Sequence, residues 1–231
     1  PCVASWSPYH GAAYAVVEAA AKVVAAGARY ERMRYSYQEY FERMTRNPES
    51  WGKPLGALLG ALKMQVELGL PSIGGKDSMS GTFQDINVPP MLMAFGITTV
   101  DAGRVISTDF KKAGHSIYLV RHTPLENHMP DTEALKRNFD FVSSAIESGK
   151  IVSGYAVGFG GVAEALAKMN DAGKLQMVIE KLPEIAAAVA EPMSKIGNIT
   201  IIGGGSGESG ESAGAADVAR YTVGALKAVN E

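Results

Sequence analysis

Apolar residues recur at helical spacing in two long stretches near the start of the chain. The first stretch runs from about His10 to Ala26, and Gly27 follows it, as a glycine commonly follows the last turn of a helix. The second runs from about Lys53 to Gly69. Its spacing predicts one buried side. That side comprises Leu55, Leu58, Leu59, Leu62, Val66 and Leu68.

The stretch between these helices, residues 29–51, is aromatic and charged. Its tyrosines, arginines and glutamates predict a loop followed by a short amphipathic helix, which Asn47-Pro48 ends. Because the chain has no basic stripe, we expect these tyrosines to pack inside the protein or at an interdomain interface rather than to stack on bases.

Short apolar runs alternate with helical patterns further along. Residues 91–100 predict a buried strand, and extended structure is also expected over residues 105–107, 116–120 and 151–157. Helices are expected over residues 132–148 and 162–169. This alternation of helices and strands indicates an α/β or α+β fold.

The pattern changes after Asn170. We expect a helix over residues 175–191 that is interrupted near Pro183, a short strand over 199–202 and a closing helix over 217–229. Residues 203–214 are rich in Gly, Ser and Glu, a composition typical of a flexible tail.

The composition narrows the function classes. The chain carries 22 basic and 24 acidic residues, a net charge of -2, which gives no attraction to nucleic acid or to an anionic membrane. A single cysteine, Cys2, excludes an intramolecular disulfide framework and fits the cytoplasm. No apolar run is long enough to cross a membrane, and the first residues do not form a signal peptide. Because the sequence begins with Pro1, we expect a fragment or a processed product.

Residues 74–81 combine two adjacent glycines, a lysine, an aspartate and two serines. Glycines let the backbone approach a ligand closely, and a lysine can meet phosphate oxygens. An aspartate can hold magnesium. The spacing is also that of an ordinary turn, which spacing alone favours, and it is not the longer glycine-rich loop that ends in Gly-Lys-Ser/Thr. Both interpretations stay open on spacing alone.

Four motifs occur in the order in which they occur in one enzyme family. These motifs are Trp6–Ala12 (WSPYHGA), Gly74–Ser80 (GGKDSMS), Val88–Leu92 (VPPML) and Asp109–Gly114 (DFKKAG). With them, residues 1 to about 169 resemble the second synthetase half of phosphoribosylformylglycinamidine synthase, an amidotransferase of purine biosynthesis.

The resemblance implies an ATP-dependent ligase that uses magnesium and glutamine-derived ammonia. Such an enzyme converts formylglycinamide ribonucleotide to its amidine: ATP activates the amide oxygen, and ammonia then displaces phosphate. The implied partners are the ribonucleotide, the first synthetase half and the glutaminase domain. The chain alone is therefore expected to be inactive.

The implied fold is similar to aminoimidazole ribonucleotide synthase. Residues 1–112 would form part of an N-terminal-type synthetase domain, and residues 113–169 would begin a C-terminal-type domain. Both would be incomplete, and residues 170–231 would form a separate tail.

The resemblance also implies a nucleotide or phosphate site. The family's Gly-Lys-Asp-Ser loop falls on Gly75, Lys76, Asp77 and Ser78. His10 falls on its Ser-Pro-x-His-Gly segment, where it would contact a nucleotide or cap the helix that follows. The resemblance leaves the catalytic residues unassigned.

The metal ligands of this half depart from the family pattern. The family places a glutamate and an asparagine four residues apart on a helix, where both can bind magnesium; here Glu18 is followed by Lys22. An ammonium group cannot bind a cation. The family's Asp-x-Ser-Asp-Gly-Gly turn is here residues 156–161, without either aspartate. We therefore expect a degenerate site in which binding of ATP or ADP with magnesium is lost or weakened.

The tail resembles a different family. Residues 171–231 are similar to the C-terminal region of flotillin, a membrane-associated scaffold, through Lys174–Ile185, Ala190–Ile196 and Ile199–Gly205. Flotillin's membrane-binding N-terminal domain has no counterpart here, so no membrane binding is implied. The tail favours a second hypothesis, a non-catalytic interaction or scaffold module. A third is a regulatory domain that binds nucleotide without turnover.

Overall fold

A computed structural model of the chain describes residues 2–171, 173–174 and 181–183, all of which belong to one unit, Pro1–Pro183. The elements expected over residues 175–180 and 184–231 lie outside the described residues. The elements of this unit, in chain order, are α1 (Cys2–Trp6), α2 (Pro8–Ala25), η1 (Tyr30–Arg32), β1 (Arg34–Tyr40), α3 (Pro48–Leu68), β2 (Ser72–Ser78), β3 (Thr82–Phe83), β4 (Ile86–Asn87), β5 (Met91–Ile97), η2 (Ala102–Arg104) and α4 (Thr132–Glu147). A further helix covers residues 161–171.

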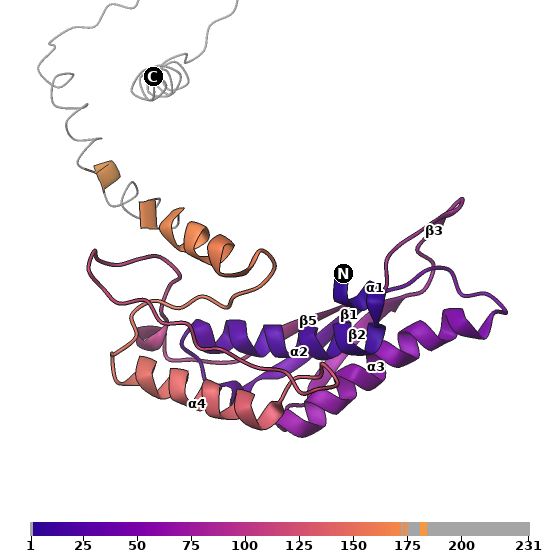
Figure 1. Cartoon of the computed structure of the whole chain (residues 1–231), viewed down its shortest axis with the longest axis horizontal. Helices are drawn as coiled ribbons and strands as arrows, with labels where there is room; N and C mark the ends of the chain where they lie inside the picture. Colours follow the sequence, from indigo (N-terminus) through magenta and orange to yellow (C-terminus); the bar gives the residue numbers. More distant parts are fainter. Residues whose placement is uncertain (1, 172, 175–180, 184–231) are drawn as a thin grey trace, which may run out of the picture. The chain divides into compact units, whose positions relative to one another are not determined.

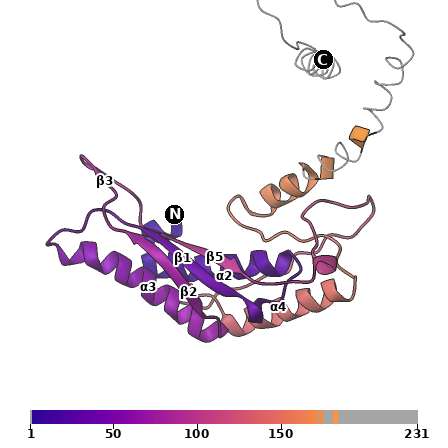
Figure 2. The same cartoon turned by 180° about the vertical axis from the view of Figure 1, so that it is seen from behind.

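Three strands form one sheet, in the order β2-β1-β5 (Figure 2). The central strand β1 pairs in parallel with β2 and antiparallel with β5. Side chains alternate between the two faces of a strand. Tyr35, Tyr37 and Glu39 therefore share one face of β1, and Gln38 and Tyr40 share the other.

Helix α2 covers the face that carries Tyr35. The Tyr35 hydroxyl donates a hydrogen bond to the Val16 carbonyl of α2 at 3.0 Å, and both residues are fully buried. The opposite face remains open among the described residues, with Phe95 and Ile97 of β5 exposed. The sheet thus has its core on one side only.

Helices α3 and α4 lie beside α2 (Figure 1). Close packing of α2 and α3 requires Gly60, because a Cβ at that position would lie 2.0 Å from the Tyr9 carbonyl oxygen. At the end of α3, Glu67 accepts a hydrogen bond from Thr132 of α4 at 3.1 Å. Arg29, which follows α2, binds Glu147 of α4 through two hydrogen bonds of 2.8 and 2.6 Å.

Capping residues mark the ends of the long helices. Ser7 caps α2 and Asn47 caps α3, each followed by proline at the first helical position, and Asp131 caps α4. Gly69 adopts the left-handed conformation that ends α3.

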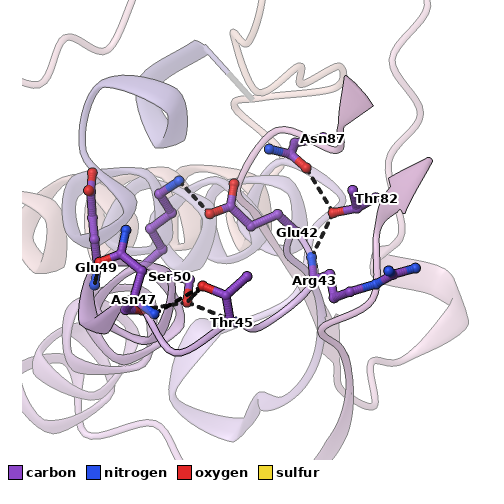
Figure 3. A network of polar contacts seen from close by, with 9 residues as sticks. Glu42, Arg43, Thr45, Asn47, Glu49, Ser50, Thr82 and Asn87 are labelled. Carbon is purple, nitrogen blue, oxygen red and sulfur yellow. Dashed lines mark hydrogen bonds and ion pairs between the residues drawn. The ribbon is translucent and has the colours of Figure 1, made fainter. Parts of the chain in front are cut away.

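A polar network joins the turn before α3 to the β3-β4 hairpin (Figure 3). The Thr82 hydroxyl accepts from the Arg43 amide and donates to the Asn87 side chain, both at 2.8 Å. Nearby, Lys53 of α3 pairs with Glu42 at 2.9 Å. The network ties the segment that follows β2 to the start of α3.

Several sequence expectations are confirmed. The structure has the helices predicted over residues 10–26, 132–148 and 162–169 and the strand that begins at Met91. The mixed α/β class is confirmed as well.

The expectation for residues 29–51 was wrong, because β1 and the start of α3 occupy this stretch. Tyr35 and Tyr37 alternate with polar residues at strand spacing, and a buried sheet face holds them. The expectation that they pack inside the protein is correct.

The predicted buried side of the helix over residues 53–69 was also wrong. Only Leu68 of that set is buried, whereas Leu55, Leu58, Leu59, Leu62 and Val66 are exposed. The small residues Ala57, Gly60 and Ala61 face the protein instead, since they allow α3 to approach α2 closely.

The strands expected over residues 105–107, 116–120 and 151–157 are not present in the described structure. These segments contain β-branched residues but pair with no strand ladder, and Tyr118 is 85% exposed. Strand propensity depends on packing and on a paired strand, and within the described part of the chain none of these segments has a paired strand.

Candidate functional site

The residues matched to the Gly-Lys-Asp-Ser loop form most of a strand. Residues 74–78 belong to β2, an edge strand, so the expectation of a loop at the start of residues 74–81 was wrong. A Cβ at Gly75 would lie 2.6 Å from the Tyr37 carbonyl oxygen, which makes glycine a packing requirement.

Strand geometry separates the two charges of this motif. Lys76 is paired in register with Gln38, and Asp77 with Glu39. Lys76 and Ser78 therefore share the open face of the sheet, whereas Asp77 lies on the side of the helices. Lys76 and Asp77 form no ion pair among the described residues, and both are exposed. The cation and the hydroxyl of Ser78 are left available on the open face.

Sequence reasoning missed Glu39, which is only 4% exposed. Its Oε1 atom and the Tyr37 hydroxyl are buried and lack a hydrogen-bond partner within the described structure. Burial, with a smaller contribution from the negative charge of Asp77, raises the pKa of Glu39 to about 7. Its strand-spaced position between Tyr37 and Phe41 was the available sequence signal.

His10 lies in the first turn of α2, and both of its ring nitrogens have partners. Nδ1 lies 2.8 Å from the Ser7 hydroxyl, and Nε2 lies 3.0 Å from the Asn127 carbonyl oxygen. The Tyr14 hydroxyl donates to the His128 carbonyl of the same loop at 2.9 Å. Ser7, and not His10, caps the helix. In the described residues no hydrogen bond connects His10 to β2, so the structure does not bring together all predicted site residues.

Glu18 and Lys22 lie one turn apart on α2. Their side chains form an ion pair with 2.7 Å between Oε1 and Nζ, and both are more than half exposed. Glu18 also faces the turn at residues 158–161, since a Cβ at Gly158 would lie 3.7 Å from its carboxylate. Glu18 and residues 158–159 of this turn line one cleft together with Lys111, most of β5 and one side of α4.

A second ion pair borders this cleft. Asp109 accepts hydrogen bonds of 2.7 and 2.9 Å from Lys111, and it also accepts one from Ser107. The bond from Lys111 and then the bond from Ser107 hold the pKa of Asp109 below its ordinary value. Ser153 donates to the Asp109 carbonyl and the Gly154 amide donates to the Ser107 carbonyl, so these two residues lie against this motif.

Glu18 and Asp109 are thus each engaged by a lysine. Within the described ranges, no group of three or more His, Cys, Asp or Glu side chains could hold a metal ion. No described helix is long and apolar enough to cross a membrane.

Comparison with known proteins identifies distant relatives of this chain. Phosphoribosylformylglycinamidine synthase subunit PurL from Acidiphilium cryptum is 26% identical over 204 residues, which cover 79% of this chain and 27% of that relative. The PurL subunit from Methylocella silvestris is 27% identical over 158 residues, which cover 61% of this chain and 22% of the relative. The chain is a distant homologue of PurL.

Solved structures of PurL share the fold. Thermotoga maritima PurL complexed with ATP matches with a TM-score of 0.54 and 19% identity, over 74% of this chain and 27% of that chain. The same protein complexed with FGAR matches with a TM-score of 0.51 and 16% identity, over 74% of this chain and 30% of that chain. The chain therefore spans only about a quarter of the length of its PurL relatives.

A short stretch of the chain is similar to a protein that is unrelated to PurL. Human flotillin-2 is 45% identical over 42 residues, which cover 18% of this chain and 10% of flotillin-2. No model of a known protein family matches the chain.

Proposed function

We propose that the chain is part of the second synthetase half of a phosphoribosylformylglycinamidine synthase, with a nucleotide site that has lost its magnesium. The relatives act in the formation of formylglycinamidine ribonucleotide, and Thermotoga maritima PurL has been solved with ATP, ADP and FGAR. The homology and shared fold support a role in the same cytoplasmic pathway.

The observation that carries the proposal is the ion pair between Glu18 and Lys22. A magnesium ion at Glu18 would have to displace an ammonium group that lies 2.7 Å away. The turn that Glu18 faces carries Ala156 and Phe159 at the two positions where the family pattern has aspartates. The residues present do not fit magnesium, so no catalytic step through the metal is assigned to this half.

The phosphates of a nucleotide have a different contact. Lys76 and Ser78 lie on the open face of the sheet, where a cation and a hydroxyl would meet phosphate oxygens. Gly75 allows β2 to lie close to Tyr37 of β1, and His10 contacts the loop that contains Asn127. We infer a site that retains at most weak, metal-independent contact with a nucleotide.

The organisation follows from the homology. In this proposal residues 1–112 are part of the N-terminal-type domain, residues 113–169 begin the C-terminal-type domain and residues 170–231 form the tail. The first synthetase half and the glutaminase domain would be separate partners. The open face of the sheet, with Phe95 and Ile97 exposed, is the surface that such a domain would cover.

An activity assay tests this proposal. The purified chain, supplied with ATP, magnesium, ammonia and formylglycinamide ribonucleotide, is expected to produce no amidine above the rate without protein. Turnover that disappears in Lys76→Ala would contradict the proposed role.

A second candidate function is an interaction module, which one observation favours. Helix α3 exposes an apolar face that no described element covers. The short flotillin-2 match supports the same candidate. A chain that serves as a scaffold is expected to self-associate without nucleotide.

A further inference from the structure

The exposed face of α3 is unusual for a helix on a protein surface. Between residues 51 and 66 every exposed position is apolar or glycine. The large exposed side chains on this face are Trp51, Leu55, Leu58, Leu59, Leu62 and Val66, with exposed fractions between 47% and 71%. We call this set the α3 face. Apolar patches of this kind on soluble proteins commonly mark interaction sites.

The spacing along the α3 face fits a helix as partner. Leu55, Leu59, Leu62 and Val66 are separated by four, three and four residues, which is the alternation of a coiled-coil seam. The seam and its flank run about 22 Å along the helix from residue 51 to residue 66, at 1.5 Å per residue. Such a seam packs its side chains between those of a second helix.

The α3 face is also complementary to itself when the helix direction is reversed. Reversal about the midpoint between Leu58 and Leu59 exchanges these two residues. It also exchanges Leu55 with Leu62, and Trp51 with Val66. An interface between identical copies related by a two-fold axis has this property, because residue i of one copy contacts j of the other and j contacts i.

Charges near the α3 face do not oppose a second copy. Lys53 is neutralised by Glu42 at 2.9 Å, and Lys63 pairs with Glu67 within the same helix. Neither lysine is exposed to the extent of the leucines. Two copies can therefore meet without placing unpaired like charges against each other.

We propose that α3 is a homodimerisation helix, and that two copies of this chain pack their α3 faces antiparallel across a two-fold axis between Leu58 and Leu59. The proposal does not depend on nucleotide binding or on catalysis. Its interface excludes charged side chains, so the dimer is expected to persist at high salt.

The first test is the mass in solution. Light scattering on the full chain is expected to give twice the chain mass of 24.4 kDa. The double variant Leu58→Glu with Leu62→Glu is expected to give the mass of one chain. Its dissociation constant for the dimer is expected to be at least tenfold larger than that of the wild-type chain. The matched control, Val105→Glu, places a glutamate at another exposed apolar position and is expected to leave the dimer intact.

Two results of this first test would contradict dimerisation through the α3 face. A wild-type chain that is monomeric, or that associates equally well with both glutamates present, overturns the proposal. Loss of association in Phe95→Glu alone would assign the contact to the open sheet face instead. Circular dichroism confirms that each variant is folded.

The second test keeps the helix apolar and determines its orientation. Cys2 is first replaced by serine, and Leu55→Cys and Leu62→Cys are prepared as separate proteins. A short bis-maleimide is expected to cross-link the mixture several-fold more than either protein alone, because residue 55 faces residue 62 only in an antiparallel pair. Cross-linking of Leu55→Cys alone that equals or exceeds that of the mixture overturns the antiparallel pairing. If no sample is cross-linked, the proposed interface itself is overturned.

Discussion

The ammonium group of Lys22 lies 2.7 Å from the carboxylate of Glu18, one turn away on α2. This single contact places a cation where a metal ligand would be needed. Both side chains are exposed, so the pair contributes little to stability. The pair matters for ligand binding instead, because a metal ion could bind the Glu18 carboxylate only by displacing the Lys22 ammonium group.

Replacement of Lys22 should change metal binding without changing the fold. In Lys22→Asn, the amide oxygen adds a ligand beside Glu18, and we expect measurable manganese binding by electron paramagnetic resonance where the wild-type chain shows none. Lys22→Met is the control, because it removes the charge of the ammonium group without adding an oxygen ligand. Equal manganese binding by the wild-type chain would show that the ion pair does not block the site.

Glu39 should make stability depend on pH. Its pKa is raised from the ordinary 4.5 to about 7 in the folded chain, so the folded state binds the proton more tightly than the unfolded state. The contribution of Glu39 to stability is complete below pH 4.5 and is lost as pH rises towards about 7.

The variant Glu39→Gln should remove this dependence. At pH 8 the free energy of unfolding, measured in urea, is expected to exceed that of the wild-type chain by on the order of 1–3 kcal/mol. At pH 4.5 the two proteins should differ much less. A Glu39→Gln chain that is less stable at pH 8 would show that the carboxylate has a partner that stabilises its charge.

Variants of Gly75 and Lys76 should differ in stability, because Gly75 is needed for packing and Lys76 is an exposed candidate ligand-binding residue. Gly75→Ala places a methyl group 2.6 Å from the Tyr37 carbonyl and is expected to lower stability by about 1–3 kcal/mol. Lys76→Ala alters an exposed side chain and should change stability by less than about 0.5 kcal/mol. Equal thermal stability of Gly75→Ala and the wild-type chain would contradict the close contact.

Gly60 should be the more costly of two glycines within α3. Gly60→Ala would bring a methyl group 2.0 Å from the Tyr9 carbonyl, whereas a Cβ at Gly52 meets nothing within 4 Å. We expect Gly60→Ala to destabilise by about 1–3 kcal/mol. Gly52→Ala should stabilise by up to about 1 kcal/mol through helix propensity. Urea titration of both variants measures the contrast.

The sequence predicts the helices well where local signals are strong. Ser7-Pro8 and Asp131 mark the starts of α2 and α4, and each acts through a hydrogen bond to its own helix. The strand from Met91 is equally clear, because its apolar run is bounded by Pro90.

Two features could not be predicted because they depend on neighbours far along the chain. The buried face of α3 is the one with Gly60, because only a glycine fits beside the Tyr9 carbonyl. The larger leucines of α3 therefore lie on the exposed face. The strand character of Gly74 and Gly75 comes from pairing with β1, which overrides the turn preference of the local sequence.

The site is predicted only in part. The sequence indicated that Lys22 and the turn at residues 156–161 lack metal ligands, and the structure adds that Glu18 pairs with Lys22 and faces Gly158. It could not indicate that Lys76 and Asp77 lie on opposite faces, nor that both ring nitrogens of His10 are occupied. These facts follow from strand alternation and from the loop at Asn127.

Calorimetric titration of ATP, with and without magnesium, into the full chain and into Glu18→Ala shows whether this half has lost its magnesium site. We expect that magnesium does not increase the affinity for ATP and that Glu18→Ala binds ATP as the wild-type chain does, within about twofold, or 0.4 kcal/mol. Tight magnesium-dependent binding of ATP that is abolished by Glu18→Ala would contradict it.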